Sequence, residues 1–357
     1  MVKRESNYDF LRVISTVAVI IIHVSGTYID AFTDEKFFGY INFDHAFVSC
    51  LYNILSRFAV PCFVMLSGAF LLDNEKNADY GYFYKKSFRA VGIPTIIFSA
   101  LYFLYSILRN AVKIYALNDD MTILAKPFQN LIRGEPFYHM WYLYMLIGVY
   151  ILIPVIIKFK NDVGEKKFEI VSFVFLIFAS LSLFSSSHKL NWDPGSSFCY
   201  CGYLMAGYTI RKRSRASNML GICKLFAGAG ILIAVSLLRY RAACNGLTDN
   251  DLKYSLSGPG SLLVYIASVL IFSGFANLDI KLDFGRLSSL TFLIYLFHAG
   301  IWDVLRLCLN RLGKADIISN SVIAIPLCTV IVFILSVICS VIYKNIWAKI
   351  ERKIYKK

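Results

Sequence analysis

Residues 7–28 read NYDFLRVISTVAVIIIHVSGTY, an apolar run with Asp9 and Arg12 near its start and His23 well inside it. A run of this length can cross the hydrocarbon core of a membrane as a helix. In one helix, the eleven-residue step from Arg12 to His23 covers about three turns, so both side chains, and Asp9 with them, lie on one face. Polar groups inside a membrane helix are energetically costly and often functional. The stretch therefore predicts a membrane helix with a functional polar face.

The rest of the chain has the same apolar character. Of its 357 residues, 57% are hydrophobic and 17% are charged, and the mean hydropathy is +0.59, which excludes an ordinary soluble domain. Apolar runs long enough for membrane helices lie at residues 8–30, 46–72, 90–112, 138–157, 168–186, 197–210, 219–239, 258–276, 287–309 and 319–346. We therefore expect an all-α polytopic transmembrane helix bundle of about ten helices, forming one integral membrane domain over residues 1–357.

The net charge of +14 would suit binding to nucleic acid, but the positions of the charges argue against such a partner. With the N-terminus inside and an even number of spans, the inner segments hold more Lys and Arg than the outer ones. The positive-inside rule then predicts cytoplasmic N- and C-termini. Dense inner clusters at residues 211–215 and 349–357 are explained by topology and by attraction to anionic lipid headgroups. We expect the lipid bilayer as a partner and no nucleic acid.

Cations also occur in or beside the second and third runs. Arg57 lies inside the second run, where a charge is costly unless it faces a partner or a wet cavity, and Pro61, one turn later, is expected to kink that helix. Lys86 and Arg89, one turn apart, lie at the cytoplasmic mouth of the third run. Their spacing suits a phosphate-bearing ligand, and it suits a plain positive-inside anchor equally well.

Two further pairs of side chains are candidates for substrate binding. His139 and Trp141 lie where the fourth run begins, either as part of an interfacial aromatic belt or as the lining of a cavity for a polar, saccharide-like acceptor. His298 lies deep in the ninth run, one turn after Tyr295, either as a hydrogen-bonded structural group or as a participant in chemistry. We take these four residues, with Arg57, as candidate substrate-binding residues.

A deep histidine is a good general base, because burial favours the uncharged imidazole. Such a base can deprotonate a hydroxyl that attacks an activated acyl carbon. A cytoplasmic thioester donor with phosphate groups, acyl-CoA, fits the cations Arg12, Lys86 and Arg89. The residues therefore favour acyl transfer, with His23 as the catalytic base. The nine Cys include no CxxC pair, and we expect no metal.

Several motifs resemble those of the acyltransferase-3 family of integral membrane O-acyltransferases. DFLRVISTVAVIIIH resembles the family's Arg-x10-His signature, with Arg12 and His23 on its fixed positions. FVMLSGAFLL resembles its second-helix motif, and Lys86-Ser87-Phe88-Arg89 its Arg-x-x-Arg. HMWYLYMLIGVYILIPVI and FLIYLFHAGI are similar to its His-x-Trp and Tyr-Leu-x-His segments. The five motifs occur in the family's order and cover nearly the whole chain.

The resemblance implies acyl-CoA as donor at the inner face and transfer of an acyl group, most often acetyl, to a sugar or lipid-linked acceptor. It also implies that His23 is the catalytic base and that Arg12 binds or orients acetyl-CoA. Lys86 departs from the family's motif, since it keeps the charge of Arg but loses the bidentate geometry. We expect a multi-pass protein of a bacterial plasma membrane that acetylates a cell-surface polysaccharide, a sugar or a lipid-linked acceptor.

Other functions remain open. A proton-coupled small-molecule transporter could use His23 or His298 as a proton relay, although no paired half-repeats with matching broken helices are evident. Some members of the same family carry a membrane domain implicated in moving an amino acid. An inert scaffold is a third possibility, because intramembrane hydrogen bonds can serve only to hold helices together. The alignment of Asp9, Arg12 and His23 on one face argues against a scaffold.

Overall fold

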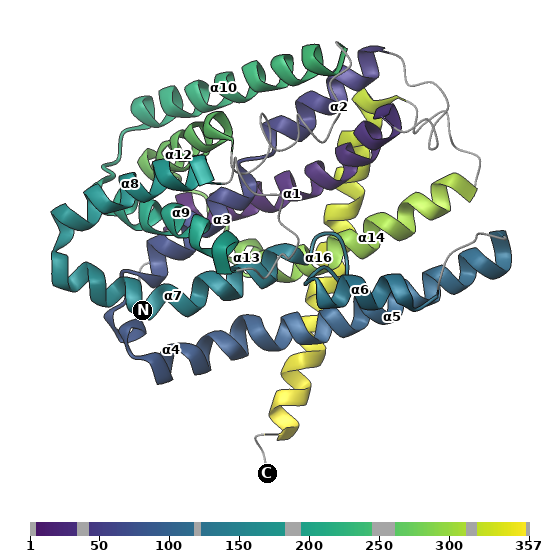
Figure 1. Cartoon of the computed structure of the whole chain (residues 1–357), viewed down its shortest axis with the longest axis horizontal. Coiled ribbons are helices and arrows are strands. Elements are labelled where there is room, and N and C mark those ends of the chain that lie inside the picture. The colour runs from purple at the N-terminus through teal and green to yellow at the C-terminus, as the bar shows by residue number, and fades with distance from the viewer. Residues whose placement is uncertain are drawn as a thin grey trace. The chain divides into compact units, whose positions relative to one another are not determined.

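The computed structural model describes residues 5–33, 43–117, 123–182, 194–244, 261–311 and 320–354, and none of these residues is in a strand (Figure 1). Seven helical segments in these ranges are long and apolar enough to cross a membrane: Ser6–Tyr28, Phe47–Leu71, Tyr80–Val112, Trp141–Val163, Asn218–Ala242, Thr291–Leu309 and Ser321–Lys349. The predicted all-α polytopic bundle is therefore confirmed. The count of about ten helices and the cytoplasmic termini stay predictions.

Two compact units make up the chain, unit 1 from Met1–Phe63 with Ser214–Lys357 and unit 2 from Val64–Arg213. Unit 1 contains α1 (Ser6–Thr33), α2 (Phe43–Leu55), the start of α3 (Ala59–Leu71), α10 (Asn218–Cys244), α12 (Leu262–Asn277), α13 (Gly285–Ser288), α14 (Thr291–Arg311) and α16 (Ser321–Ile354). Unit 2 contains the rest of α3, η1 (Glu75–Ala78), α4 (Tyr80–Ser87), η2 (Phe88–Gly92), α5 (Ile93–Leu117), α6 (Ala125–Ile132), α7 (Trp141–Val163), α8 (Glu165–Ser182) and α9 (Pro194–Arg213).

Unit 1 is organised around α1, which packs against α2, α12, α13, α14 and α16, while α10 packs along α12 (Figure 1). Its apolar core joins Ile20, Val24 and Tyr28 of α1 to residues of α14 and α16. These three residues recur every fourth position, so they form one stripe of the helix, and His23 and Arg12 point to an adjacent face. The amphipathic pattern of α1 thus places an apolar core and a polar site side by side within one unit.

The second predicted span, residues 46–72, is broken in its middle. α2 ends at Leu55, residues 56–58 form a turn, and α3 begins at Ala59. Pro61 has no N–H to donate to the carbonyl of Arg57 four residues earlier, and its ring crowds that carbonyl. The kink expected at Pro61 is therefore a break one turn before it, and Arg57 lies in that break.

In unit 2, α3 and α9 cross with their backbones in contact, at Gly68 and Gly207. A Cβ placed on Gly68 would lie 1.7 Å from the carbonyl oxygen of Leu204, and one on Gly207 would lie 1.9 Å from that of Met65. Only glycine fits at either position. Small residues let membrane helices approach closely and gain van der Waals contact over their backbones.

Side chains from other segments cap the C-terminal end of α3. Three side chains donate hydrogen bonds to backbone carbonyl oxygens there: Arg211 of α9 to Ala69 at 2.9 Å, Asn77 of η1 to Leu71 at 2.8 Å, and Lys160 of α7 to Leu72 at 2.8 Å. These carbonyls have no partner within the helix, and burying them unsatisfied would be costly. The three donors therefore tie α7, α9 and η1 to the end of α3.

Ion pairs hold most of the cationic cluster at residues 211–215. Arg211 and Lys212 each contact Asp73 at 2.9 Å, and Arg213 pairs with Glu169. Burial raises the pKa of the Asp73 carboxyl, but hydrogen bonds from Lys212 and Arg211 outweigh this and leave the pKa below its ordinary value. We predicted from the sequence that this cluster sets the topology and contacts lipid. That prediction is incomplete, because these cations also join segments of unit 2.

Candidate functional site

Arg12 is held near the start of α1 by a buried carboxylate. Its Nη1 donates to Oδ1 of Asp9, one turn earlier, at 2.8 Å. The same oxygen accepts the hydroxyl of Ser288, on α13, at 2.6 Å. Asp9 is buried, whereas the Arg12 side chain is 31% exposed. Asp9 therefore orients the guanidinium, and part of that group stays accessible to an anionic ligand.

His23 lies about three turns beyond Arg12 on α1, and there it contacts a second histidine from another helix. The ring centroids of His23 and His298, on α14, lie 5.2 Å apart with 32° between their planes. His23 is partly exposed and His298 is 1% exposed. One turn beyond, the indole N–H of Trp302 donates to the Thr27 hydroxyl at 3.2 Å, which also ties α14 to α1. The structure thus brings two imidazoles together inside the helical bundle of unit 1.

Tyr295, one turn before His298 on α14, contacts His298 in two ways. Nδ1 of His298 lies 2.6 Å from the backbone carbonyl oxygen of Tyr295, and the two rings have centroids 5.4 Å apart. Tyr295 is itself buried. Of the predicted substrate-binding residues, His298 is therefore placed next to His23, and Tyr295 next to His298.

Arg57, in the break between α2 and α3, is joined to α1 by an asparagine. Its Nε and Nη2 both donate to Oδ1 of Asn53, at 3.0 and 2.8 Å. Nδ2 of Asn53 donates in turn to the carbonyl of Ile22 at 3.0 Å and to the hydroxyl of Ser25 at 3.1 Å. Ile22 precedes His23. The network therefore fixes the guanidinium of Arg57 relative to the turn of α1 that carries His23.

Lys86 and Arg89 lie in unit 2 where α4 passes into a π-helical turn. Lys86 belongs to the last turn of α4 and Arg89 to η2, and both are exposed. The ammonium of Lys86 lies 5.7 Å from the centre of the Tyr82 ring. π-Helical turns are rare and are frequent at functional sites. The predicted Arg-x-x-Arg-like pair thus presents two accessible cations on an unusual backbone.

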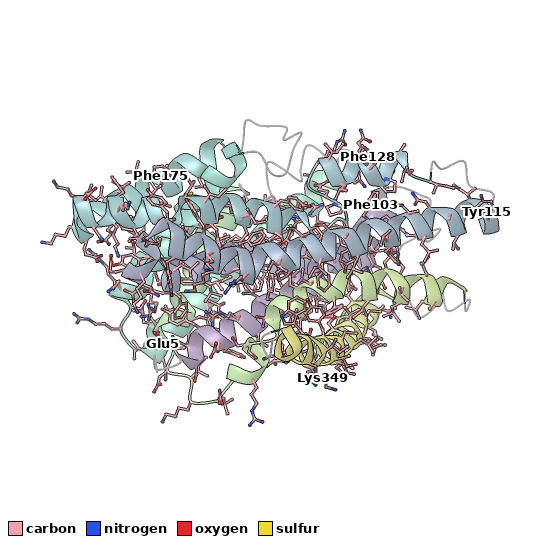
Figure 2. The ribbon with its side chains drawn as sticks, turned by 90° about the horizontal axis from the view of Figure 1, so that it is seen from below. Glu5, Phe103, Tyr115, Phe128, Phe175 and Lys349 are labelled. Carbon is pink, nitrogen blue, oxygen red and sulfur yellow. The ribbon has the colours of Figure 1, made fainter. Side chains whose placement is uncertain are left out.

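Aromatic rings enclose His139. It is 0% exposed, and its ring lies 5.0 Å from that of Tyr102 and 5.9 Å from those of Phe137 and Tyr138. Trp141 begins α7 and is partly buried. Tyr102 belongs to α5, the long helix along which Figure 2 labels Phe103 and Tyr115, with Phe128 on the neighbouring α6. His139 is therefore packed into the aromatic interior of unit 2.

The predicted site residues fall into two groups. Unit 1 holds Arg12, His23, Arg57, Tyr295 and His298, and unit 2 holds Lys86, Arg89, His139 and Trp141. Within the first group, the structure joins His23 to His298 and joins Arg57 to α1.

Sequence reasoning missed Asn53 and Ser288. Asn53 is a polar residue one helical turn before Arg57 in an apolar run, and that spacing is the signal that could have found it. Ser288 lies 279 residues from Asp9 along the chain, so its contact with Asp9 follows only from the tertiary fold.

Comparison with known proteins gives one finding. No curated protein and no solved structure matches the chain. The sequence model of the acyltransferase-3 family, described as an acyltransferase domain, matches residues 5–342, which is nearly the whole chain and includes every site residue above. The chain therefore belongs to the acyltransferase-3 family and is a membrane acyltransferase.

Proposed function

We propose that the protein is an O-acetyltransferase that moves an acetyl group from cytoplasmic acetyl-CoA to a hydroxyl of a cell-surface polysaccharide, a sugar or a lipid-linked acceptor. The observation that carries the proposal is the position of His23, a partly exposed imidazole on a membrane-spanning helix that also carries the accessible, oriented guanidinium of Arg12. A base and an anion-binding group on one face of one helix suit a thioester donor with phosphate groups.

In the proposed reaction, His23 removes the proton of the acceptor hydroxyl as its oxygen attacks the thioester carbonyl carbon. A C–O bond forms, the C–S bond breaks, and the proton passes from His23 to the leaving thiolate to give free CoA. A positioned base of this kind contributes typically about 10²- to 10⁴-fold to the rate. His23 and the acetyl group together account for the chemical step without a metal.

Cations supply the proposed contacts to the donor. Arg12 is oriented by Asp9, so its guanidinium loses little freedom when it binds a phosphate. Lys86 and Arg89 are exposed and one turn apart in the sequence, so both cations are accessible to a phosphate-bearing ligand. We assign these three residues to the nucleotide end of acetyl-CoA.

The remaining residues are assigned to the reacting carbonyl and to the acceptor. Arg57, which Asn53 holds beside the His23 turn, and Tyr295 are suitable donors to the oxyanion that forms at the thioester carbonyl. Trp141 is proposed to contact the acceptor, since an aromatic side chain offers a flat surface to a sugar ring. His139 is proposed to offer ring nitrogens to it, which requires the surrounding aromatic rings to move, because His139 is 0% exposed.

The test is turnover of radiolabelled acetyl-CoA by the purified protein in nanodiscs, comparing wild type with His23→Ala and Arg12→Ala. Ser15→Ala is the matched control, because Ser15 is a buried polar residue on the same helix. We expect His23→Ala to lower kcat about 10²-fold or more, Arg12→Ala mainly to raise KM, and Ser15→Ala to do neither. Failure of folded wild type to bind or turn over acetyl-CoA would refute the proposal and favour the carrier function.

A further inference from the structure

The pair formed by His23 and His298 suggests a division of labour between two imidazoles. Their ring centroids are 5.2 Å apart with 32° between the ring planes, so the two imidazoles lie side by side. His23 is partly exposed, whereas His298 is 1% exposed and lies behind it on α14. His23 is therefore the more accessible of the two imidazoles, and His298 is the inner one.

The contact with Tyr295 determines the tautomer of His298. A backbone carbonyl oxygen can only accept a hydrogen bond, so the 2.6 Å contact requires the proton of His298 to be on Nδ1. A neutral imidazole carries one ring proton, so Nε2 then bears the lone pair. His298 is thus prepared to accept a proton at Nε2, while the carbonyl of Tyr295 holds the ring in place and stabilises the positive charge that protonation creates.

We propose that His298 is the positioning residue and proton relay of His23, an inference that rests on the proposed acyl transfer. When His23 takes the proton of the acceptor hydroxyl on one ring nitrogen, it passes the proton of its other nitrogen to Nε2 of His298. The positive charge then resides on His298, next to the Tyr295 carbonyl. As the C–S bond breaks, both protons move back by one step, and the leaving thiolate is protonated by His23.

This arrangement performs the task that a carboxylate performs behind many catalytic histidines. The partner must hold the base in one tautomer and orientation and share its developing charge. A neutral imidazole does this in a membrane span without the cost of a buried carboxylate. His298 is therefore expected to affect the chemical step and to have little effect on donor binding.

A kinetic experiment tests the relay with water as the acceptor, by measuring hydrolysis of radiolabelled acetyl-CoA. His298→Asn retains an N–H near the position of Nδ1 but has no atom at Nε2, and Ser336→Ala, which removes a buried hydrogen bond of 2.7 Å on α16, is the control for general loosening of unit 1. We expect His298→Asn to lower kcat about 10²-fold with KM for acetyl-CoA unchanged. A wild-type kcat in His298→Asn, or a parallel change of kcat and KM in both variants, would overturn the relay.

A spectroscopic experiment tests the pair without turnover. The chain has five His, so ring-¹⁵N-labelled histidine gives few signals, and His23→Gln and His298→Asn assign the two of interest. We expect the His298 spectrum to show a protonated Nδ1, and the His23 nitrogens to shift when His298 is replaced but not in Ser336→Ala. If the signals of the His23 nitrogens do not shift when His298 is replaced, the proposal is overturned. Coupled signals in a wild type that does not turn over acetyl-CoA would instead preserve the pair and refute the acyl transfer.

Discussion

Replacing Gly68 with alanine is expected to disrupt the crossing of α3 and α9. The added Cβ would lie 1.7 Å from the carbonyl oxygen of Leu204, whereas ordinary contact begins at 3.4 Å. The obstacle is backbone on both sides, so no side-chain rotation can relieve it, and the helices must separate along their closest contact. Overpacking costs typically about 1–3 kcal/mol where side chains can adjust, and we expect at least about 3 kcal/mol here.

The second glycine of the crossing provides an internal check. Gly207→Ala should cost a similar amount, because its Cβ would lie 1.9 Å from the carbonyl oxygen of Met65. The double variant should cost clearly less than the sum of the two, since helices already separated by the first methyl group have room for the second. Gly230→Ala on α10 is the matched control, as its Cβ would meet nothing within 4 Å.

The assay is unfolding in mixed micelles with increasing denaturing detergent, followed by circular dichroism and by retention of the folded band. The control variant should equal or slightly exceed the stability of wild type, by at most about 1 kcal/mol, from the better helix propensity of alanine. A Gly68→Ala protein within about 0.5 kcal/mol of wild type would show that the close crossing does not exist, since changes of this size are typical of surface substitutions.

Three further predictions concern the polar networks. Asn53→Ala should lower kcat for acetyl-CoA roughly 10²-fold, because it releases the guanidinium of Arg57. Asn53→Asp keeps an oxygen that accepts the hydrogen bonds of Arg57 and should retain more activity. Equal losses of kcat in steady-state kinetics would contradict this. Asp9→Asn should raise KM for acetyl-CoA several-fold with kcat little changed, because Arg12 loses its orienting carboxylate, and binding of labelled acetyl-CoA measures this. Burial raises the pKa of the Asp73 carboxyl, but hydrogen bonds from Lys212 and Arg211 hold that pKa below its usual value. The stabilisation from ionised Asp73 is therefore complete above about pH 4 and is lost as the pH falls through the lower pKa of the folded state. Asp73→Asn should therefore unfold more easily than wild type at pH 7, and the difference in melting temperature should vanish in acid.

Much of unit 1 follows from local patterns in the sequence. A membrane span needs only a run of about 20 apolar residues, and the helical repeat then determines which residues share a face. The polar face of α1 was predicted on this basis, and the structure places Asp9 and Arg12 in contact on it. Pro61 was likewise a correct signal of a disturbed helix, although the disturbance is a break at residues 56–58 that a local rule does not distinguish from a kink.

The contacts that define the candidate chemistry could not be predicted in this way. His298 and His23 lie 275 residues apart in the sequence, and each was an isolated histidine in an apolar run. Asn53 was passed over because an asparagine in a span has many possible partners. Which partner it meets depends on how α1 and α2 pack.

The sequence by itself determined the membrane-spanning helical class, the family and the residues that carry ionisable groups, because apolar length, helical periodicity and motif order are properties of the chain. Only the tertiary structure decided that His23 has an imidazole neighbour, that Asn53 joins Arg57 to α1, and that Gly68 and Gly207 meet a backbone. The physical reason is that these are contacts between helices. In a membrane such contacts depend on close packing and on satisfying buried polar groups, and neither is visible in the hydropathy of a single segment.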